Sequence, residues 1–367
     1  MQNFFSSHVI YECALTGYTP TVNEALLNND QQNTGAFLPL EDGELIHDTA
    51  NSSAILDMLP KPSFSYLAIS HSSSLISQYT SLPDEATFQA LCAMIKRFDI
   101  RYAQEWSVQR LSIEDQLLLT LMKFKLNLPH FDLAFRFGVS TATVSNIFVT
   151  FVWVLHQVLW EGIMANNVPS RAKCKQTLPL AFADFPNCRI IIDCTEVEIA
   201  VPANLQNHCS TYSNYKGRAT FKALVGCSPN GVLVYASDLY GGSTHDKAIT
   251  KDCGILEYLE TGDSLLVDKG FTISYLVSDG VVVNMPSFLY NGQFTASQVQ
   301  ANKKIAGVRI HIERAIQRVK IYRILDQIPW QYRKLANKLF QVCVALTNLQ
   351  TPIISEVSSM QHVIAAP

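Results

Sequence analysis

The sequence lacks the cysteine spacings of a zinc site or a disulfide framework, although it contains nine cysteines. They are scattered, odd in number and set mostly in apolar runs, and neither C-x-x-C nor a cysteine–histidine cluster with zinc-ligand spacing occurs. This pattern argues against a zinc finger and against a small disulfide-stapled fold. It predicts free, buried thiols in a reducing compartment.

Long apolar runs and an excess of basic charge are also missing. No run of 18 or more apolar residues occurs, and no basic stretch precedes an apolar one at the amino terminus. We therefore expect a soluble, intracellular protein with no membrane span and no secretory signal. The net charge is −3 and the pI about 6.3. A nucleic-acid partner would therefore have to bind a local basic surface.

The 367 residues, 48% of them hydrophobic, are sufficient for two or three packed domains. Residues 1–80 are rich in Ser, Asn, Thr and Pro and hold no regular period, which predicts a poorly ordered arm. Residues 81–165 read as a helical domain, 185–352 as a mixed α/β domain and 353–367 as a carboxy-terminal tail.

The helical segment contains the pattern of a helix-turn-helix. Gly138 predicts a tight turn, Ser140 predicts a helix cap, and apolar helical periods flank both. In such a motif the start of the second helix faces the bases of DNA. The polar residues at that start are Thr141, Thr143, Ser145 and Asn146. A helical hairpin without DNA contact would need the same turn and cap, so spacing alone leaves both interpretations open.

From residue 185 the pattern changes to short apolar strands. RIIIDCTEVEIA predicts one strand, and two more flank a Ser-Pro-Asn-Gly turn at 228–231. A helix is predicted over THDKAITKDCGILEYLETG, closed by Gly262, before the strands SLLVDKGF and GVVVNMP. Helices return over 297–347. This order predicts a mixed sheet flanked by helices.

Three carboxylates stand out in this domain. Asp193 and Asp268 each follow an apolar strand, so both are expected at the carboxyl edge of one sheet, where α/β sheets bind ligands. Glu313 lies on a helix rich in basic residues. Clustered carboxylates need a cation to stay ionised, and Mg²⁺ prefers oxygen ligands. Alternatively, the aspartates cap turns or helices and Glu313 pairs with Arg309 or Arg314.

Further polar residues are weaker candidates. Asp246 rivals Asp268 as the second acid, but Gly241 and Gly242 before it predict a turn and a helix cap. With His245 it is a candidate for supporting contacts to a metal site. Basic residues on the predicted strand and helix that suit phosphate contacts are Lys216, Arg218, Lys222, Arg309, Arg314, Arg318 and Lys320. No G-x-S-x-G is present, which argues against a serine hydrolase.

Several motifs together resemble a known family. They are IIIDCTEVEIAVP, TYSNYKGRATFKALVGCSPNGVLVYASDLYGGSTHDKAIT, GDSLLVDKGF and VRIHIERAIQRVKIYRIL, preceded by LTLMKFKLNLPHFDLAFRFGVSTATVSNIF. The order and content resemble the DDE-superfamily endonucleases of PIF/Harbinger-type transposases and of their relatives joined to a THAP finger. The resemblance covers roughly residues 82–352.

This resemblance implies an RNase H-like α/β fold after an all-α helix-turn-helix domain. It implies a catalytic and metal-binding triad of Asp193, Asp268 and Glu313, which holds two Mg²⁺ or Mn²⁺ ions for DNA cleavage and strand transfer. It also implies a protein of the nucleus, with the cytoplasm as an alternative, that acts on DNA and can form homo-oligomers.

The THAP finger itself is missing, because its cysteine–histidine spacing does not occur. DNA binding would then depend on the helix-turn-helix or on a separate DNA-binding partner protein. One alternative is a domesticated transposase that binds DNA or protein without cutting. Another is an RNase H-like nuclease that acts on a different nucleic acid.

Overall fold

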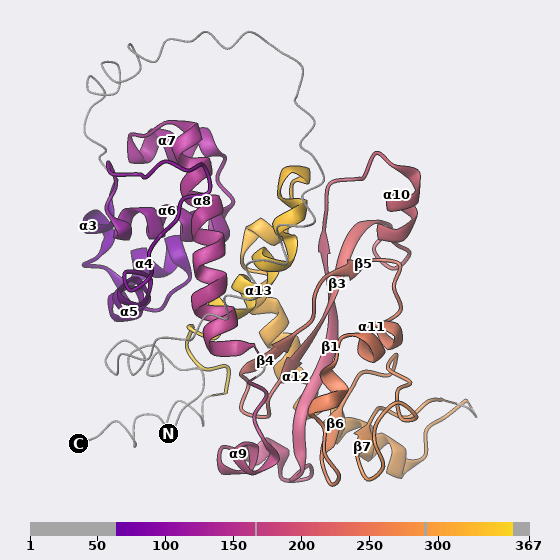
Figure 1. The fold of residues 1–367 in the computed structure, drawn as a ribbon. Coiled ribbons are helices and arrows are strands. Elements are labelled where there is room, and N and C mark those ends of the chain that lie inside the picture. Colours follow the sequence, from indigo (N-terminus) through magenta and orange to yellow (C-terminus); the bar gives the residue numbers. More distant parts are fainter. Residues whose placement is uncertain (1–63, 166, 290–291, 355–367) are drawn as a thin grey trace, which may run out of the picture.

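A computed structural model describes residues 64–354 except 166, 290 and 291, and its first half is helical (Figure 1). The helices are α3 (Tyr66–Ile69), α4 (Ser73–Thr80), α5 (Glu85–Ile95), α6 (Ile113–Leu126), α7 (His130–Phe137) and α8 (Thr141–Leu155). Helices α3 and α4 lie within the predicted arm, so the part of it after residue 63 is helical. The apolar side chains of Ile69 and Ile76 are buried there, which an irregular polar arm would not achieve. Residues 1–63 and 355–367 lie outside the described part.

The predicted helix boundaries around the turn are confirmed. The hydroxyl of Ser140 accepts a hydrogen bond from the Thr143 backbone N–H at 3.0 Å and begins α8. Gly138 ends α7 with a φ of 61°, in the left-handed region that favours glycine. The two helices and their turn therefore form as the sequence pattern predicts.

Helix α8 continues into a π-helical segment, η3 (His156–Met164). The combined helix Thr141–Met164 is long and apolar enough to cross a membrane by length and composition alone. However, 61% of its most apolar window is buried inside the protein. It packs against α6, α7 and α13 (Ala336–Thr347). Its hydrophobicity is therefore that of a core helix.

The second half contains a mixed sheet with the strand order β4-β3-β1-β6-β7. Strands β1, β3 and β4 form an antiparallel meander, while β6 and β7 run parallel to β1. Their bounds are β1 (Cys188–Glu198), β3 (Arg218–Cys227), β4 (Leu233–Ala236), β6 (Ser264–Leu266) and β7 (Val282–Asn284). The short strands β2 (Tyr212–Ser213) and β5 (Tyr240–Gly241) add to β3. This sheet confirms the predicted fold class.

Helices cover the sheet and join it to the helical domain (Figure 1). Helix α12 (Ala296–Val319) packs on β1 and β3, whereas α13 packs on β4, on α12 and on α8 with η3. The remaining elements are α9 (Arg171–Gln176), η4 (Leu180–Phe182), α10 (Leu205–Thr211), α11 (Asp246–Asp252), η5 (Ile255–Tyr258), η6 (Arg323–Leu325) and η7 (Trp330–Leu335). The helix predicted to run to Gly262 stops at Asp252, because Gly254 adopts a φ of 81°.

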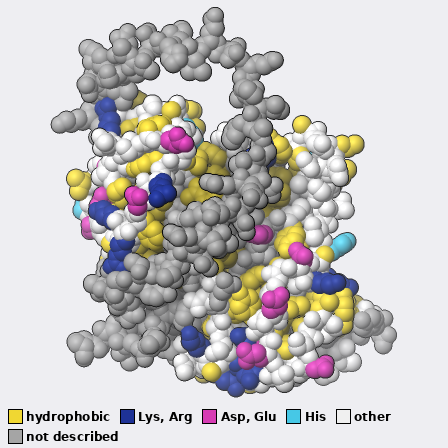
Figure 2. Space-filling model, viewed as in Figure 1, with side chains coloured by type: hydrophobic (Ala, Val, Ile, Leu, Met, Phe, Trp, Pro, Cys, Tyr) yellow, Lys and Arg dark blue, Asp and Glu magenta, His cyan; other side chains and the backbone are white. Residues whose placement is uncertain are grey.

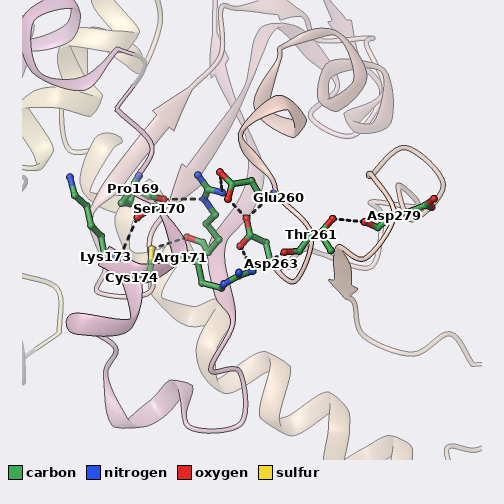
Figure 3. A network of polar contacts seen from close by, with 10 residues as sticks. Pro169, Ser170, Arg171, Lys173, Cys174, Glu260, Thr261, Asp263 and Asp279 are labelled. Atoms are coloured by element: carbon green, nitrogen blue, oxygen red, sulfur yellow. Dashed lines mark hydrogen bonds and ion pairs between the residues drawn. The ribbon is translucent and has the colours of Figure 1, made fainter.

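A buried ionic network ties the starts of β1 and β6 together (Figure 3). The Asp263 carboxylate, fully buried before β6, accepts hydrogen bonds from Arg189 Nη1 at 2.7 Å and from Arg171 Nη1 at 2.9 Å. Arg189 lies in β1 and also donates to the Pro169 carbonyl at 3.0 Å. These charge-assisted bonds hold the two parallel strands in register at their amino ends.

Candidate active site

Asp193 and Asp268 lie at the same level of neighbouring parallel strands. Ile191 of β1 pairs with Leu266 of β6, and each aspartate stands two residues beyond its member of that pair. As predicted over RIIIDCTEVEIA, β1 continues past Asp193 to Glu198, where it pairs with β3. What ends before Asp193 is the parallel pairing with β6. This leaves both aspartates at the carboxyl edge of the parallel part of the sheet.

Helix α12 brings Glu313 and Arg309 toward the same edge. The Arg309 guanidinium lies 2.9 Å from Asp268 Oδ1 and 4.0 Å from Glu313 Oε1. The side chain of Arg309 is only 11% exposed, whereas those of Asp268 and Glu313 are 49% and 54% exposed. Arg309, predicted to contact DNA, therefore pairs with two of the three predicted catalytic acids instead of lying on the open surface.

Asp193 is the most enclosed of the three acids. Burial raises the pKa of its carboxyl group to about 6, and the nearby Arg309 guanidinium and the Cys194 backbone N–H act in the opposite direction. The carboxylates of Asp268 and Asp246 raise this pKa further. Asp193 Oδ1 accepts the Cys194 N–H at 2.8 Å. The site therefore concentrates negative charge in a partly desolvated place.

The donor chemistry fits a divalent cation. Carboxylate oxygens are the ligands that Mg²⁺ and Mn²⁺ prefer, and a partly buried carboxylate gains from a nearby cation. As the side chains stand, no group of three or more His, Cys, Asp or Glu within the described residues is close enough to hold a metal. At Asp268 the positive charge comes from Arg309 instead. Asp193 and Asp268, with Glu313 from α12, are the residues that would hold an ion.

Asp246 lies near Asp193 but does not cap a helix. It is the first residue of α11, His245 occupies the cap position without a side-chain bond, and Asp246 Oδ1 accepts a bond from Lys222 Nζ at 3.2 Å. Lys222 also lies 3.6 Å from Glu196 and is 14% exposed. The charge of Lys222 is thus already paired with two carboxylates, which leaves less of it for the DNA contact predicted for this residue.

A hollow of about 280 Å³ opens beside these residues. It is lined by Lys222, His245, Asp246, Lys247, Gly270 and Thr272. At its margin, Lys247 Nζ lies 4.6 Å from the centre of the Tyr275 ring. Lys269 Nζ lies 5.3 Å from the centre of the Phe288 ring. Such cation–aromatic pairs suit both phosphates and bases.

Lys247 and Lys269 were not among the site residues predicted from the sequence. Each directly follows a singled-out acid, in HDK and in VDKGF, and that adjacency was the available signal.

Several other predicted phosphate contacts gather in a second hollow of about 290 Å³. Lys216, Arg218 and Lys320 line it, together with the acids Glu196, Glu198 and Asp326. Arg218 Nη1 lies 2.6 Å from Glu198 Oε2, so part of this positive charge is already paired. On α12, Arg314 is exposed, whereas Arg318 donates to the Thr351 carbonyl. The basic residues thus occupy separate places and do not form a single track.

The predicted DNA-reading residues of α8 differ in exposure. Thr141 is exposed, Thr143 and Ser145 are half-buried, and Thr143 Oγ1 lies 2.9 Å from the hydroxyl of Ser140. Asn146 is fully buried. Its side chain accepts the Gln104 N–H and donates to the Trp106 carbonyl, both at 3.0 Å. The assignment of Asn146 to the DNA surface was therefore wrong, because a polar residue in this apolar helix is satisfied by the loop before α6.

Two segments of the chain match models of known protein families. Residues 192–348, which include the three acids, match the model described as DDE superfamily endonuclease. Residues 109–160 match the helix-turn-helix of DDE superfamily endonuclease. No curated protein matches the chain.

A cryo-EM structure of the piggyBac transposase synaptic complex with hairpin DNA is similar over 80% of this chain and 79% of that chain. The sequence identity is 11% and the TM-score 0.37. The two family models cover the helix-turn-helix and nearly all of the sheet domain. Residues 192–348 therefore belong to the DDE superfamily endonuclease family, and residues 109–160 ahead of them form the helix-turn-helix of that family.

Proposed function

We propose that this protein cleaves phosphodiester bonds of DNA at Asp193, Asp268 and Glu313 in the presence of Mg²⁺ or Mn²⁺. The observation that carries the proposal is the matched position of the two aspartates beyond the Ile191–Leu266 pair, with Glu313 brought toward Asp268 by α12. Carboxylates that come from one edge of a sheet and from an adjacent helix suit metal-assisted phosphoryl chemistry.

Each acid has a distinct part in this proposal. Asp193, which is held by the Cys194 N–H and enclosed by the sheet, provides a rigid ligand. Asp268 and Glu313 are about half exposed and can turn toward an ion or a substrate. A divalent cation bound to these carboxylates supplies a Lewis acid that lowers the pKa of water and offsets charge on the phosphate.

DNA binding in this proposal is divided between two parts of the chain. The start of α8 offers Thr141 to a groove, as expected for a helix-turn-helix. Near the acids, Lys247 and Lys269 with their aromatic neighbours offer contacts to a strand. Figure 2 shows basic and acidic side chains interspersed over the described part of one face. The contacts would therefore be local, as the net charge of −3 requires.

Action on DNA accords with a nuclear location.

The test is cleavage of supercoiled plasmid by the purified full chain, with and without Mg²⁺ or Mn²⁺. Asp193→Asn, Asp268→Asn and Glu313→Gln should each reduce cleavage by about a hundredfold or more, the scale of losing a charge-stabilising group. Asp99→Asn is the matched control, because that aspartate is 91% exposed in the helical domain. A chain that binds DNA but does not cut with either metal would favour the non-cutting alternative.

A further inference from the structure

Arg309 is an unusual residue for the position it occupies. The whole residue is 9% exposed, and its guanidinium contacts Asp268 at 2.9 Å while lying 4.0 Å from Glu313. Its Nε is buried without a hydrogen-bond partner among the described residues. A buried guanidinium normally satisfies all its donors. The fork of Arg309 therefore retains donor capacity that the protein itself does not use.

The position of this guanidinium conflicts with metal binding. A divalent cation on Asp268 and Glu313 would lie close to the guanidinium of Arg309, which faces one oxygen of each carboxylate, and the two positive charges would repel each other at short range in a partly desolvated site. An ion can therefore bind fully only when Arg309 leaves Asp268. The departing guanidinium then needs another anion, since a buried and unpaired charge is unfavourable.

The phosphate of a DNA strand is the anion best suited to receive it. Guanidinium forks bind phosphate oxygens in a bidentate manner, and Arg309 has an unused Nε to complete such a pair. We propose that Arg309 is a resident cation that holds Asp268 in the free protein and moves to a DNA phosphate, so that DNA and metal bind cooperatively. This inference rests on the proposed function, because it takes the same acids as the metal site.

Two consequences follow from this exchange. The free protein binds metal weakly, because Arg309 competes for the same carboxylate. DNA raises the metal affinity by drawing Arg309 away, and metal raises the DNA affinity by the same factor, since binding linkage is reciprocal. Arg309 acts here as a positioning residue for Asp268, and the bond-breaking step itself does not require it to touch the ion.

The experiment measures Mn²⁺ affinity of the full chain by electron paramagnetic resonance, with and without a short DNA duplex. Arg309→Met removes the competing cation, so Mn²⁺ affinity without DNA should increase by roughly fivefold or more, the lower end of typical coupling between sites. The enhancement by DNA should become smaller than in the wild type. Lys303→Met is the matched control, since it removes an exposed charge from the same helix and should leave both values unchanged.

Thermal unfolding followed by circular dichroism verifies that each variant is folded. Arg309→Gln, a neutral side chain that keeps hydrogen-bonding groups, provides the second test if the methionine variant does not fold. The inference is overturned if a folded neutral variant binds Mn²⁺ no more tightly than the wild type, or if its enhancement by DNA is undiminished. Cleavage of DNA by the wild type would then still support the proposed function. If neither wild type nor variants bind Mn²⁺, the inference and the metal site of the proposed function are both wrong.

Discussion

Asp193 and Asp268 each lie two residues after a member of the same strand pair, in which Ile191 of β1 is the partner of Leu266 of β6. Parallel neighbours carry equivalent positions side by side, so this register brings two carboxylates to one edge. Arg309 then offsets part of their charge from the adjacent helix.

Asp193→Asn should stabilise the metal-free protein at neutral pH. Burial raises the Asp193 pKa from 3.8 to about 6. The folded protein therefore binds this proton more tightly than the unfolded chain does. The resulting contribution to stability is fully present below about pH 3.8 and is lost as the pH rises through about 6. Asparagine is uncharged and avoids this loss, with a gain on the order of 1–2 kcal/mol above pH 6. Urea unfolding in EDTA between pH 4 and pH 8 should show a gain that grows up to about pH 6 and levels off above it. A gain independent of pH would contradict this origin.

Asp263→Ala should destabilise the protein strongly while leaving the candidate site residues in place. The substitution leaves the buried Arg189 with only the more distant and more exposed Glu260 carboxylate, at 3.6 Å, and Arg171 loses an ion pair as well. Removing one partner of a buried ion pair costs about 3–5 kcal/mol. Chemical denaturation measures the loss, and Asp279→Ala, an acid outside the ionic pairs of this network, is the comparison. An unfolding free energy close to that of the wild type would refute the structural role.

Asn146→Ala should reduce stability and should not alter DNA sequence preference. The buried amide bonds to the backbone at Gln104 and Trp106, and leaving buried partners unsatisfied costs about 1–3 kcal/mol. Thr141→Ala should behave in the opposite way, because Thr141 is exposed at the start of α8. Thermal unfolding and DNA-binding titrations on both variants distinguish the two roles. A specificity change in folded Asn146→Ala would show that this residue faces DNA after all.

Gly242→Ala should displace the segment that leads into His245 and Asp246. A Cβ at Gly242 would lie 2.7 Å from the Thr211 carbonyl oxygen and 2.9 Å from that of Thr220, and both are backbone atoms. Overpacking of this kind costs about 1–3 kcal/mol. Gly270→Ala is the control, since its Cβ would meet only Asp246 Oδ2 at 3.9 Å. Equal melting temperatures for the two variants would contradict the crowding at Gly242.

Local sequence patterns were sufficient for much of the fold. The Ser140 cap, the Gly138 turn and the 228–231 hairpin all form as predicted, because each depends on residues within a few positions of one another. Predictions failed where distant residues decided. The burial of Asn146 depends on the loop before α6, and the helices after residue 63 depend on the core they pack against.

The sequence by itself determined the kinds of chemical group available, namely strand-borne aspartates, a helix-borne glutamate and lysines beside them. It also determined membership of the family, because the motifs occur in order along the chain. Only the tertiary structure decided which charges meet. Arg309 and Asp268 are far apart in sequence but form an ion pair. Lys222 reaches Asp246 only because β3 packs against α11. The strength of an ion pair depends on the distance between the two charges in space, and the periodicity of a helix or strand does not give that distance.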